Sequence, residues 1–127
     1  MGRLHLNANV ATEARCLSSY LDAMKILRGK KALVTGAACG IGRSITLALA
    51  REGVDLYLID IDDIKIDGVA REARGYGIEV RTAHCDLAQP EQITAVVESV
   101  LSGWGRLNIL VNNAGVAHRG VHARNDP

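Results

Sequence analysis

Four short apolar segments alternate with three helix-like segments, and this alternation constrains the fold of the chain more than any other feature. The expected strands are residues 32–34, 56–59, 78–84 and 109–111. The expected helices are residues 41–52, 61–74 and 90–104. Strict strand–helix alternation implies parallel strands joined by right-handed helical crossovers. We therefore predict an α/β protein built on half of a doubly wound parallel sheet, with strand order 3-2-1-4.

The amino-terminal segment differs from the rest. Residues 10–27 carry an apolar stripe at helical spacing, and residues 1–31 hold six basic and two acidic residues. Such a helix is either a packed or mobile extension or a targeting helix, and its acidic residues disfavour a transit peptide. The predicted parts are an N-terminal helical extension at 1–29, a nucleotide-binding domain at 30–119 and a loose tail at 120–127.

Composition excludes several classes of function. The 127 residues include 15 Lys and Arg against 14 Asp and Glu, a net charge of +1, which argues against a general nucleic-acid binder. No apolar run approaches the roughly 18 residues of a membrane span, and no secretory signal block is present. Cys16, Cys39 and Cys85 are odd in number and widely spaced, so neither a disulfide framework nor a metal site is expected. We expect a cytoplasmic protein with no nucleic-acid or membrane partner.

The turn between the first strand and the first helix carries the strongest chemical signal. Residues 35–42 read TGAACGIG, with glycines at positions 36, 40 and 42. Glycines at this spacing allow a tight turn and bring backbone N–H groups close to an anion, which the positive end of the following helix also favours. The natural ligand is a pyrophosphate, and the P-loop pattern is absent. Arg43 follows directly and either approaches a phosphate or is solvated.

Asp60 ends the second expected strand, 18 residues after Gly42. A carboxylate at this place can accept both ribose hydroxyls of an adenosine and would repel a 2′-phosphate. The alternative is that Asp60 caps the next helix, although Asp62 and Asp63 are available for that role. The ribose interpretation is favoured, and with it NAD over NADP.

Two further loops follow strands at the same edge of the sheet, where ligands of open α/β sheets bind. Asp86, after the third strand, can accept from an adenine amino group, or it caps the next helix. Residues 112–115 (NNAG) follow the fourth strand. Their small residues allow close approach of a ligand and their amides can tie loops together, but a simple turn explains Asn and Gly equally well.

Taken together, these segments resemble the short-chain dehydrogenase/reductase family, whose cofactor domain is Rossmann-like. The resemblance rests on TGxxxGIG, the acidic residue 60, the DL pair at 86–87 and NNAG, and it covers about residues 30–119. It implies NAD-dependent hydride transfer between nicotinamide and a small alcohol or ketone, usually in dimers or tetramers. The residues it assigns to the cofactor are Gly36, Cys39, Gly40, Ile41, Gly42, Asp60, Asp86, Leu87, Asn112, Ala114 and Gly115. By this resemblance, Gly36, Gly40, Ile41 and Gly42 surround the pyrophosphate and adenosine ribose, and Asp60 holds that ribose. Asp86 and Leu87 hold the adenine, and the last three residues line the nicotinamide side.

Cys39 and Ile61 stand where NADP-dependent members of that family often carry a basic residue, which again favours NAD. The family's proton transfer needs a Tyr with a Lys four residues later, and none of the three tyrosines here has one. No catalytic residue is therefore assigned. The alternative function is a truncated, catalytically inactive dinucleotide-binding fragment. Another nucleotide binder, such as a methyltransferase, is disfavoured by residues 112–115.

The fourth strand would be interior in a complete domain of that family. In this chain it is expected to form an edge, with the apolar residues 109–111 unpaired on one side. Bare apolar edges promote association, so we expect a homo-oligomer or aggregation through this strand.

Overall fold

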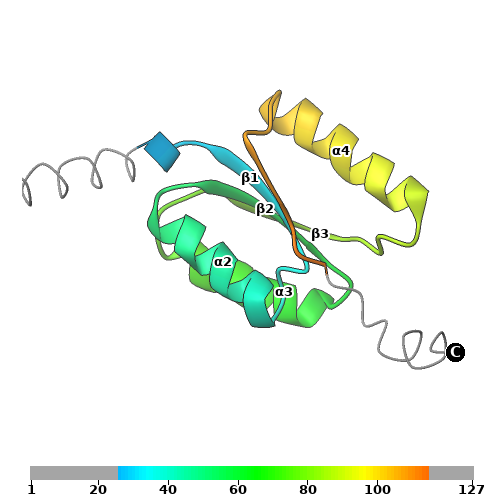
Figure 1. Cartoon of the computed structure of the whole chain (residues 1–127), viewed down its shortest axis with the longest axis horizontal. Helices are drawn as coiled ribbons and strands as arrows, with labels where there is room; N and C mark the ends of the chain where they lie inside the picture. The colour runs from blue at the N-terminus through cyan, green and yellow to red at the C-terminus, as the bar shows by residue number, and fades with distance from the viewer. Residues whose placement is uncertain (1–25, 115–127) are drawn as a thin grey trace, which may run out of the picture.

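The computed structural model describes residues 26–114. The elements are β1 (Lys31–Thr35), α2 (Gly40–Arg51), β2 (Asp55–Asp60), α3 (Asp63–Arg74), β3 (Val80–His84), α4 (Pro90–Trp104) and β4 (Ile109–Asn112). The strands form one parallel sheet in the order β3-β2-β1-β4. Helices α2 and α3 cover one face of this sheet and α4 covers the other (Figure 1). The predicted fold class and strand order are confirmed.

Some predictions about the ends of the chain cannot be compared with the structure. Most of the expected extension, residues 1–25, and the expected tail, residues 120–127, lie outside the described residues. Within residues 26–114, no helix is long and apolar enough to cross a membrane.

The position of β1 and β2 in the centre of the sheet explains why their sequences are apolar. Side chains alternate between the faces of a strand. Val34 and Leu58 therefore pack towards α2 and α3, whereas Leu33 and Tyr57 pack beneath α4. A strand covered on both faces by helices has no polar face to present to water, so both faces of β1 and β2 are apolar.

Helix α4 is less buried than its apolar stripe predicts. Of that stripe, Val96 and Val100 are buried, whereas Ile93, Val97 and Leu101 are 38%, 45% and 54% exposed. The reason lies in the sheet below, because β4 is its edge and Leu110 on this strand is itself 60% exposed. One flank of α4 therefore has no neighbour among the described residues.

The helix ends follow local chemistry. Gly53 follows α2 with a φ of +80°, the left-handed conformation that the predicted glycine stop requires. Helix α3 starts at Asp63 rather than at residue 61, because the Asp62 carboxylate accepts a hydrogen bond from the Lys65 N–H (3.0 Å) and so caps the helix. Pro90 opens α4 as predicted.

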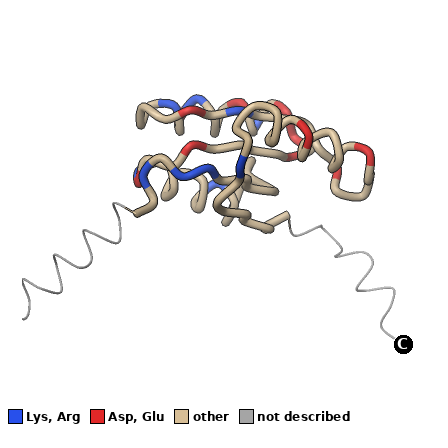
Figure 2. Tube along the Cα trace, turned by 90° about the horizontal axis from the view of Figure 1, so that it is seen from above, with Lys and Arg blue, Asp and Glu red and all other residues tan. Residues whose placement is uncertain are grey.

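Charged residues of both signs are interspersed along the described chain (Figure 2). Arg43 on α2 pairs with Glu72 on α3 at 2.6 Å between Nη2 and Oε2. The two helices are thereby linked on their outer side. The Arg43 side chain is 45% exposed in this pair, which agrees with the solvated alternative considered for it.

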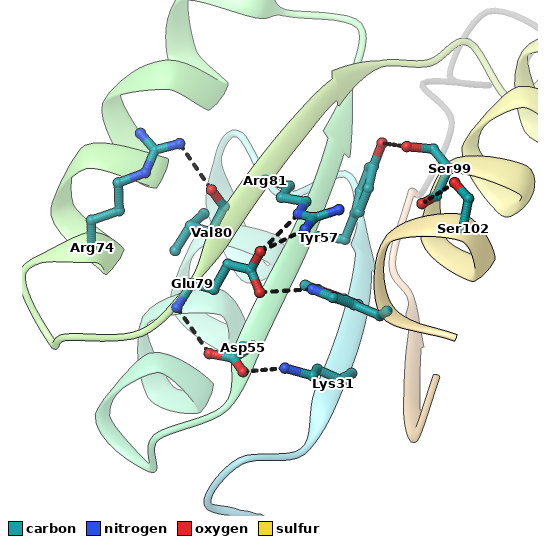
Figure 3. Close-up of polar contacts among 10 residues, drawn as sticks. Lys31, Asp55, Tyr57, Arg74, Glu79, Val80, Arg81, Ser99 and Ser102 are labelled. Carbon is teal, nitrogen blue, oxygen red and sulfur yellow. Dashed lines mark hydrogen bonds and ion pairs between the residues drawn. The ribbon is translucent and has the colours of Figure 1, made fainter. Parts of the chain in front are cut away.

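A polar cluster ties together the amino ends of the strands (Figure 3). Lys31 on β1 pairs with Asp55 on β2, whose other oxygen accepts from the Glu79 N–H (2.8 Å). The Glu79 carboxylate accepts from the Trp104 indole N–H (2.8 Å) and pairs with Arg81 (2.7 Å). The hydrogen bond from Trp104, helped by the charge of Arg81, lowers the pKa of Glu79. The C-terminal end of α4 is thus fixed where the strands begin, at the end of the sheet opposite to the glycine turn.

Candidate cofactor-binding site

The glycine turn between β1 and α2 depends on the absence of side chains. Gly36 and Gly40 have φ values of +64° and +59°, which L residues rarely adopt. A Cβ on Gly42 would lie 1.9 Å from the carbonyl oxygen of Gly36. A Cβ on Gly36 would lie 2.9 Å from the Cα of Ala114. The first turn of α2 and the loop after β4 therefore pack directly against the turn, and only glycine fits at these contacts.

The amino terminus of α2 is open. Cys39 at the N-cap makes no side-chain capping bond, and the first turn contains no acidic residue. The first helical bond runs from the Arg43 N–H to the Cys39 carbonyl (3.4 Å), so the N–H groups of Gly40, Ile41 and Gly42 precede it. Cys39 is exposed and Ile41 is 72% exposed, so this end of the helix is accessible. Free N–H groups and the helix dipole together favour an anion here.

Asp60 lies at the end of β2, beside the glycine turn. Its Oδ2 accepts from the Ala38 N–H (3.0 Å) and its Oδ1 accepts from the Asp62 N–H (3.0 Å). Of the two roles considered for Asp60, capping is excluded, because Asp62 caps α3. Carboxylate oxygens accept more than one hydrogen bond, so both oxygens of Asp60 can still receive a hydroxyl.

The loop after β4 is tied to the end of β1 by Thr35. Its hydroxyl oxygen accepts from the N–H groups of Asn113 and Ala114, both at 2.9 Å. The side-chain amide of Asn113 donates to the carbonyl of Gly36 (3.3 Å). Asn112 is exposed beside this contact, with its Oδ1 3.5 Å from the Thr35 hydroxyl. The amides of this segment do tie two loops together, as considered from the sequence. Predicted Gly115 lies outside the described residues.

The loop after β3 joins the same edge, because the Cys85 N–H donates to the Asp60 carbonyl (3.1 Å). Asp86 accepts from the Ala88 N–H (2.9 Å) and its own N–H donates to Gln92 Oε1 (2.7 Å). Asp86 therefore shapes the turn before α4 without capping that helix, whose N-cap is Gln89.

Leu87 packs beneath α4 in the same apolar cluster as Cys85. Burial, together with the nearby charge of Asp86, raises the pKa of the Cys85 thiol, so this cysteine stays protonated at neutral pH.

The structure thus connects three of the four predicted segments directly: the glycine turn, Asp60 and the loop of residues 112–114. The pair at residues 86–87 lies next to them. Neither Thr35 nor Gln92 is among the residues assigned individually to the site from the sequence. A signal for Thr35 is present in the sequence, since this hydroxyl-bearing residue follows three apolar residues of the strand and precedes the turn. No sequence signal identifies Gln92, because its partner depends on how the loop folds back over α4.

These features define a class of protein. A parallel sheet with this strand order, an open helix terminus after a glycine turn and an acidic residue at the end of the next strand form the nucleotide-binding half of a Rossmann fold. The family model described as short chain dehydrogenase matches residues 30–126. The chain belongs to the short chain dehydrogenase family.

Several relatives are similar over the same region. The chain is 39% identical over 98 residues to a 3-oxoacyl-(acyl-carrier-protein) reductase of Thermotoga maritima, covering 77% of this chain and 40% of the relative. An NAD+-bound xylitol dehydrogenase superimposes with a TM-score of 0.69 at 36% identity, covering 71% of this chain and 35% of that one. The L-sorbose reductase of Gluconobacter frateurii, in complex with NADPH and L-sorbose, gives 0.67 at 40% identity, covering 70% and 34%. The chain spans about two-fifths or less of the length of these proteins.

Proposed function

We propose that this chain binds a nicotinamide dinucleotide at the carboxyl edge of its sheet, as an NAD-dependent oxidoreductase of the short-chain type. The reaction is hydride transfer between the nicotinamide and a small alcohol or ketone. The observation that carries this proposal is the position of Asp60, whose carboxylate accepts from the N–H of Ala38 in the glycine turn at 3.0 Å. A ribose acceptor and a pyrophosphate cradle thereby share one edge of the sheet.

The residues present fit a dinucleotide. The free N–H groups at the start of α2, from Gly40 to Gly42, would receive the pyrophosphate, with Gly36 and Cys39 flanking it. Asp60 would accept the hydroxyls of the adenosine ribose, and Asp86 with Leu87 would border the adenine. The loop fixed by Thr35, which includes Asn112, Ala114 and Gly115, would face the nicotinamide. When bound, the nicotinamide supplies the hydride acceptor or donor.

We further propose that NAD is preferred over NADP. A 2′-phosphate on the adenosine ribose would meet the Asp60 carboxylate, and two like charges 4 Å apart repel by about 4 kcal/mol at an effective dielectric of 20. Cys39 and Ile61, both exposed, offer no positive charge to offset this. Solved relatives include complexes with either NAD+ or NADPH, so cofactor choice is a property of the individual chain.

Isothermal titration of the full chain with NAD and with NADP tests this proposal. We expect NAD to bind and NADP to bind at least about tenfold more weakly, a difference of about 1.4 kcal/mol. Asp60→Asn should bring the two affinities together. Asp67→Asn removes the same charge from an exposed position on α3 and is the matched control. Equal binding of both dinucleotides, or equal effects of the two variants, would contradict the proposed role of Asp60.

A turnover assay with alcohol and ketone substrates addresses the second candidate, a dinucleotide-binding chain without catalysis. That candidate is supported by the sequence alone, in which no tyrosine has a lysine four residues later. NAD binding with measurable turnover supports the oxidoreductase, and NAD binding without turnover supports the second candidate.

A further inference from the structure

The loop between β3 and α4 is held together around Asp86. The backbone N–H of Asp86 donates to Gln92 Oε1 (2.7 Å), and its carbonyl accepts from the Gln89 N–H (2.9 Å). Its side-chain Oδ1 accepts from the Ala88 N–H (2.9 Å). The peptide groups on both sides of Asp86 and its carboxylate are therefore each fixed by a hydrogen bond. The contact with Gln92 differs from the other two, because it alone joins Asp86 to another side chain, six residues further along the chain.

The position of Gln92 in α4 explains how its side chain reaches so far back. Gln92 is the third residue of the helix, which starts at Pro90. In the capping box, a Gln at this position accepts from the backbone N–H of the N-cap residue. In α4 the N-cap is Gln89, whose N–H already donates to the Asp86 carbonyl. The Gln92 side chain is thereby free to extend past the N-cap to the Asp86 N–H.

Two polar groups of this loop keep hydrogen-bonding capacity. Among residues 26–114, no group donates to Asp86 Oδ2, and the Leu87 N–H has no acceptor. A free acceptor beside a free donor is complementary to adenine, whose amino group donates next to a ring nitrogen that accepts. Hypoxanthine presents the opposite pattern, a carbonyl next to a ring N–H. The loop lies beside Asp60, because the Cys85 N–H donates to the Asp60 carbonyl (3.1 Å), so the base and the ribose of one adenosine can bind together.

We propose that Gln92 is a positioning residue for adenine recognition, because it fixes Asp86 and Leu87 so that their free acceptor and donor face the base. This inference rests on the proposed dinucleotide-binding function and adds to it a residue outside the four segments assigned from the sequence. Gln92 acts through Asp86 and not by touching the ligand. Its hydrogen bond holds the peptide group that precedes Asp86, and rotation of that group would turn the Asp86 carboxylate and the Leu87 N–H away together. The expected property is selectivity for adenine over hypoxanthine in the dinucleotide.

Titration calorimetry of the full chain with NAD and with nicotinamide hypoxanthine dinucleotide tests the proposal. We expect the parent chain to bind NAD about tenfold more tightly than the hypoxanthine analogue. Gln92→Met keeps the length and helix propensity of the side chain but replaces its acceptor by a weak one, so this selectivity should disappear. Gln92→Glu retains an acceptor at the same reach and should restore the selectivity.

Gln89→Met is the matched control. It removes the same amide three residues earlier, where the side chain makes no capping bond and the backbone N–H that donates to Asp86 is retained. Its selectivity should equal that of the parent. Equal binding of the two dinucleotides by the parent, parent-like selectivity in Gln92→Met, or equal weakening of both in that variant would each overturn the proposal. A parent chain that binds neither dinucleotide would contradict the proposed function itself, which separates the two failures.

Amide hydrogen exchange of Asp86 tests the positioning contact without ligand. The Asp86 N–H should be protected in the parent and in Gln92→Glu, and should exchange at least about tenfold faster in Gln92→Met. Unchanged protection in Gln92→Met would mean that another group holds this N–H, and would overturn the proposal. Gln92→Asn, whose side chain is one methylene shorter and should not reach, replaces Gln92→Met if circular dichroism shows that the latter does not fold.

Discussion

Helices α2 and α3 lie side by side on one face of the sheet but begin in opposite ways. Helix α3 is capped by Asp62, and Asp63 adds a negative charge to its first turn. Helix α2 begins at Cys39 with no capping bond and no acid in its first turn. Both helices follow a parallel strand, so topology does not impose this difference. The sequence satisfies one terminus with its own carboxylates and leaves the other open, at the place where we propose that a pyrophosphate binds.

The largest effect is expected from adding a methyl group to a glycine in each helix. In α2, Gly42→Ala places a Cβ 1.9 Å from the Gly36 carbonyl oxygen and should destabilise the fold by about 3 kcal/mol or more. In α3, Gly68→Ala meets nothing within 4 Å and should stabilise the fold by about 0.5–1 kcal/mol. Urea denaturation measures both. Similar effects of the two substitutions would show that the start of α2 is not tightly packed on its turn.

The next effect comes from giving α2 the start that α3 has. Cys39→Asp supplies a capping carboxylate, which should add about 0.5–2 kcal/mol to folding stability. The same charge would repel a pyrophosphate at this terminus, so NAD affinity should fall about tenfold. Cys39→Asn caps without the charge and is the control for titration calorimetry. If the Asp variant bound NAD as tightly as the parent chain, the pyrophosphate would not lie at this helix terminus.

The converse change removes the cap of α3. Asp62→Ala loses the hydrogen bond to the Lys65 N–H and should destabilise the fold by about 1 kcal/mol. NAD affinity should be unchanged, because the Asp62 backbone N–H that donates to Asp60 is retained. Thermal unfolding and titration of one protein sample give both values. A loss of NAD affinity without a loss of stability would mean that the start of α3 contacts the ligand.

The smallest effect is expected at the amino ends of the strands, where the Glu79 carboxylate accepts a hydrogen bond from the Trp104 indole N–H. The pKa of Glu79 is lowered in the folded chain from its usual 4.5, so its contribution to stability is present above that value. That contribution disappears as the pH falls through the lowered pKa. Glu79→Gln should therefore be less stable than the parent at pH 7 and equally stable in acid. The side chain is 42% exposed, so the difference should stay under about 1 kcal/mol. A difference that persists in acid would assign it to packing rather than to charge.

The element order and the glycine turn could be predicted from the sequence because both depend on local patterns. Apolar runs and helical stripes report the layers of the fold, and glycines at fixed spacing report the turn. The cap of α3 could be predicted as well, because Asp62 was available for that role beside Asp60.

The features that could not be predicted from the sequence depend on contacts between elements that are distant along the chain. The pair between Arg43 and Glu72 joins two helices and has no signal in either one alone. The stripe of α4 predicts an apolar face, but whether Val97 and Leu101 are covered depends on which strand lies beneath them and whether it forms an edge. Periodicity identifies a face and does not identify its neighbour.

The central claim is that a dinucleotide binds at the open terminus of α2. The most direct measurement is an NMR titration of the 15N-labelled chain with NAD. We expect the amide signals of Gly40, Ile41 and Gly42 to shift most, while those of Ile64 and Lys65 at the capped start of α3 stay in place. Shifts centred on α3, or NAD binding that leaves the three α2 amides unmoved, would contradict it.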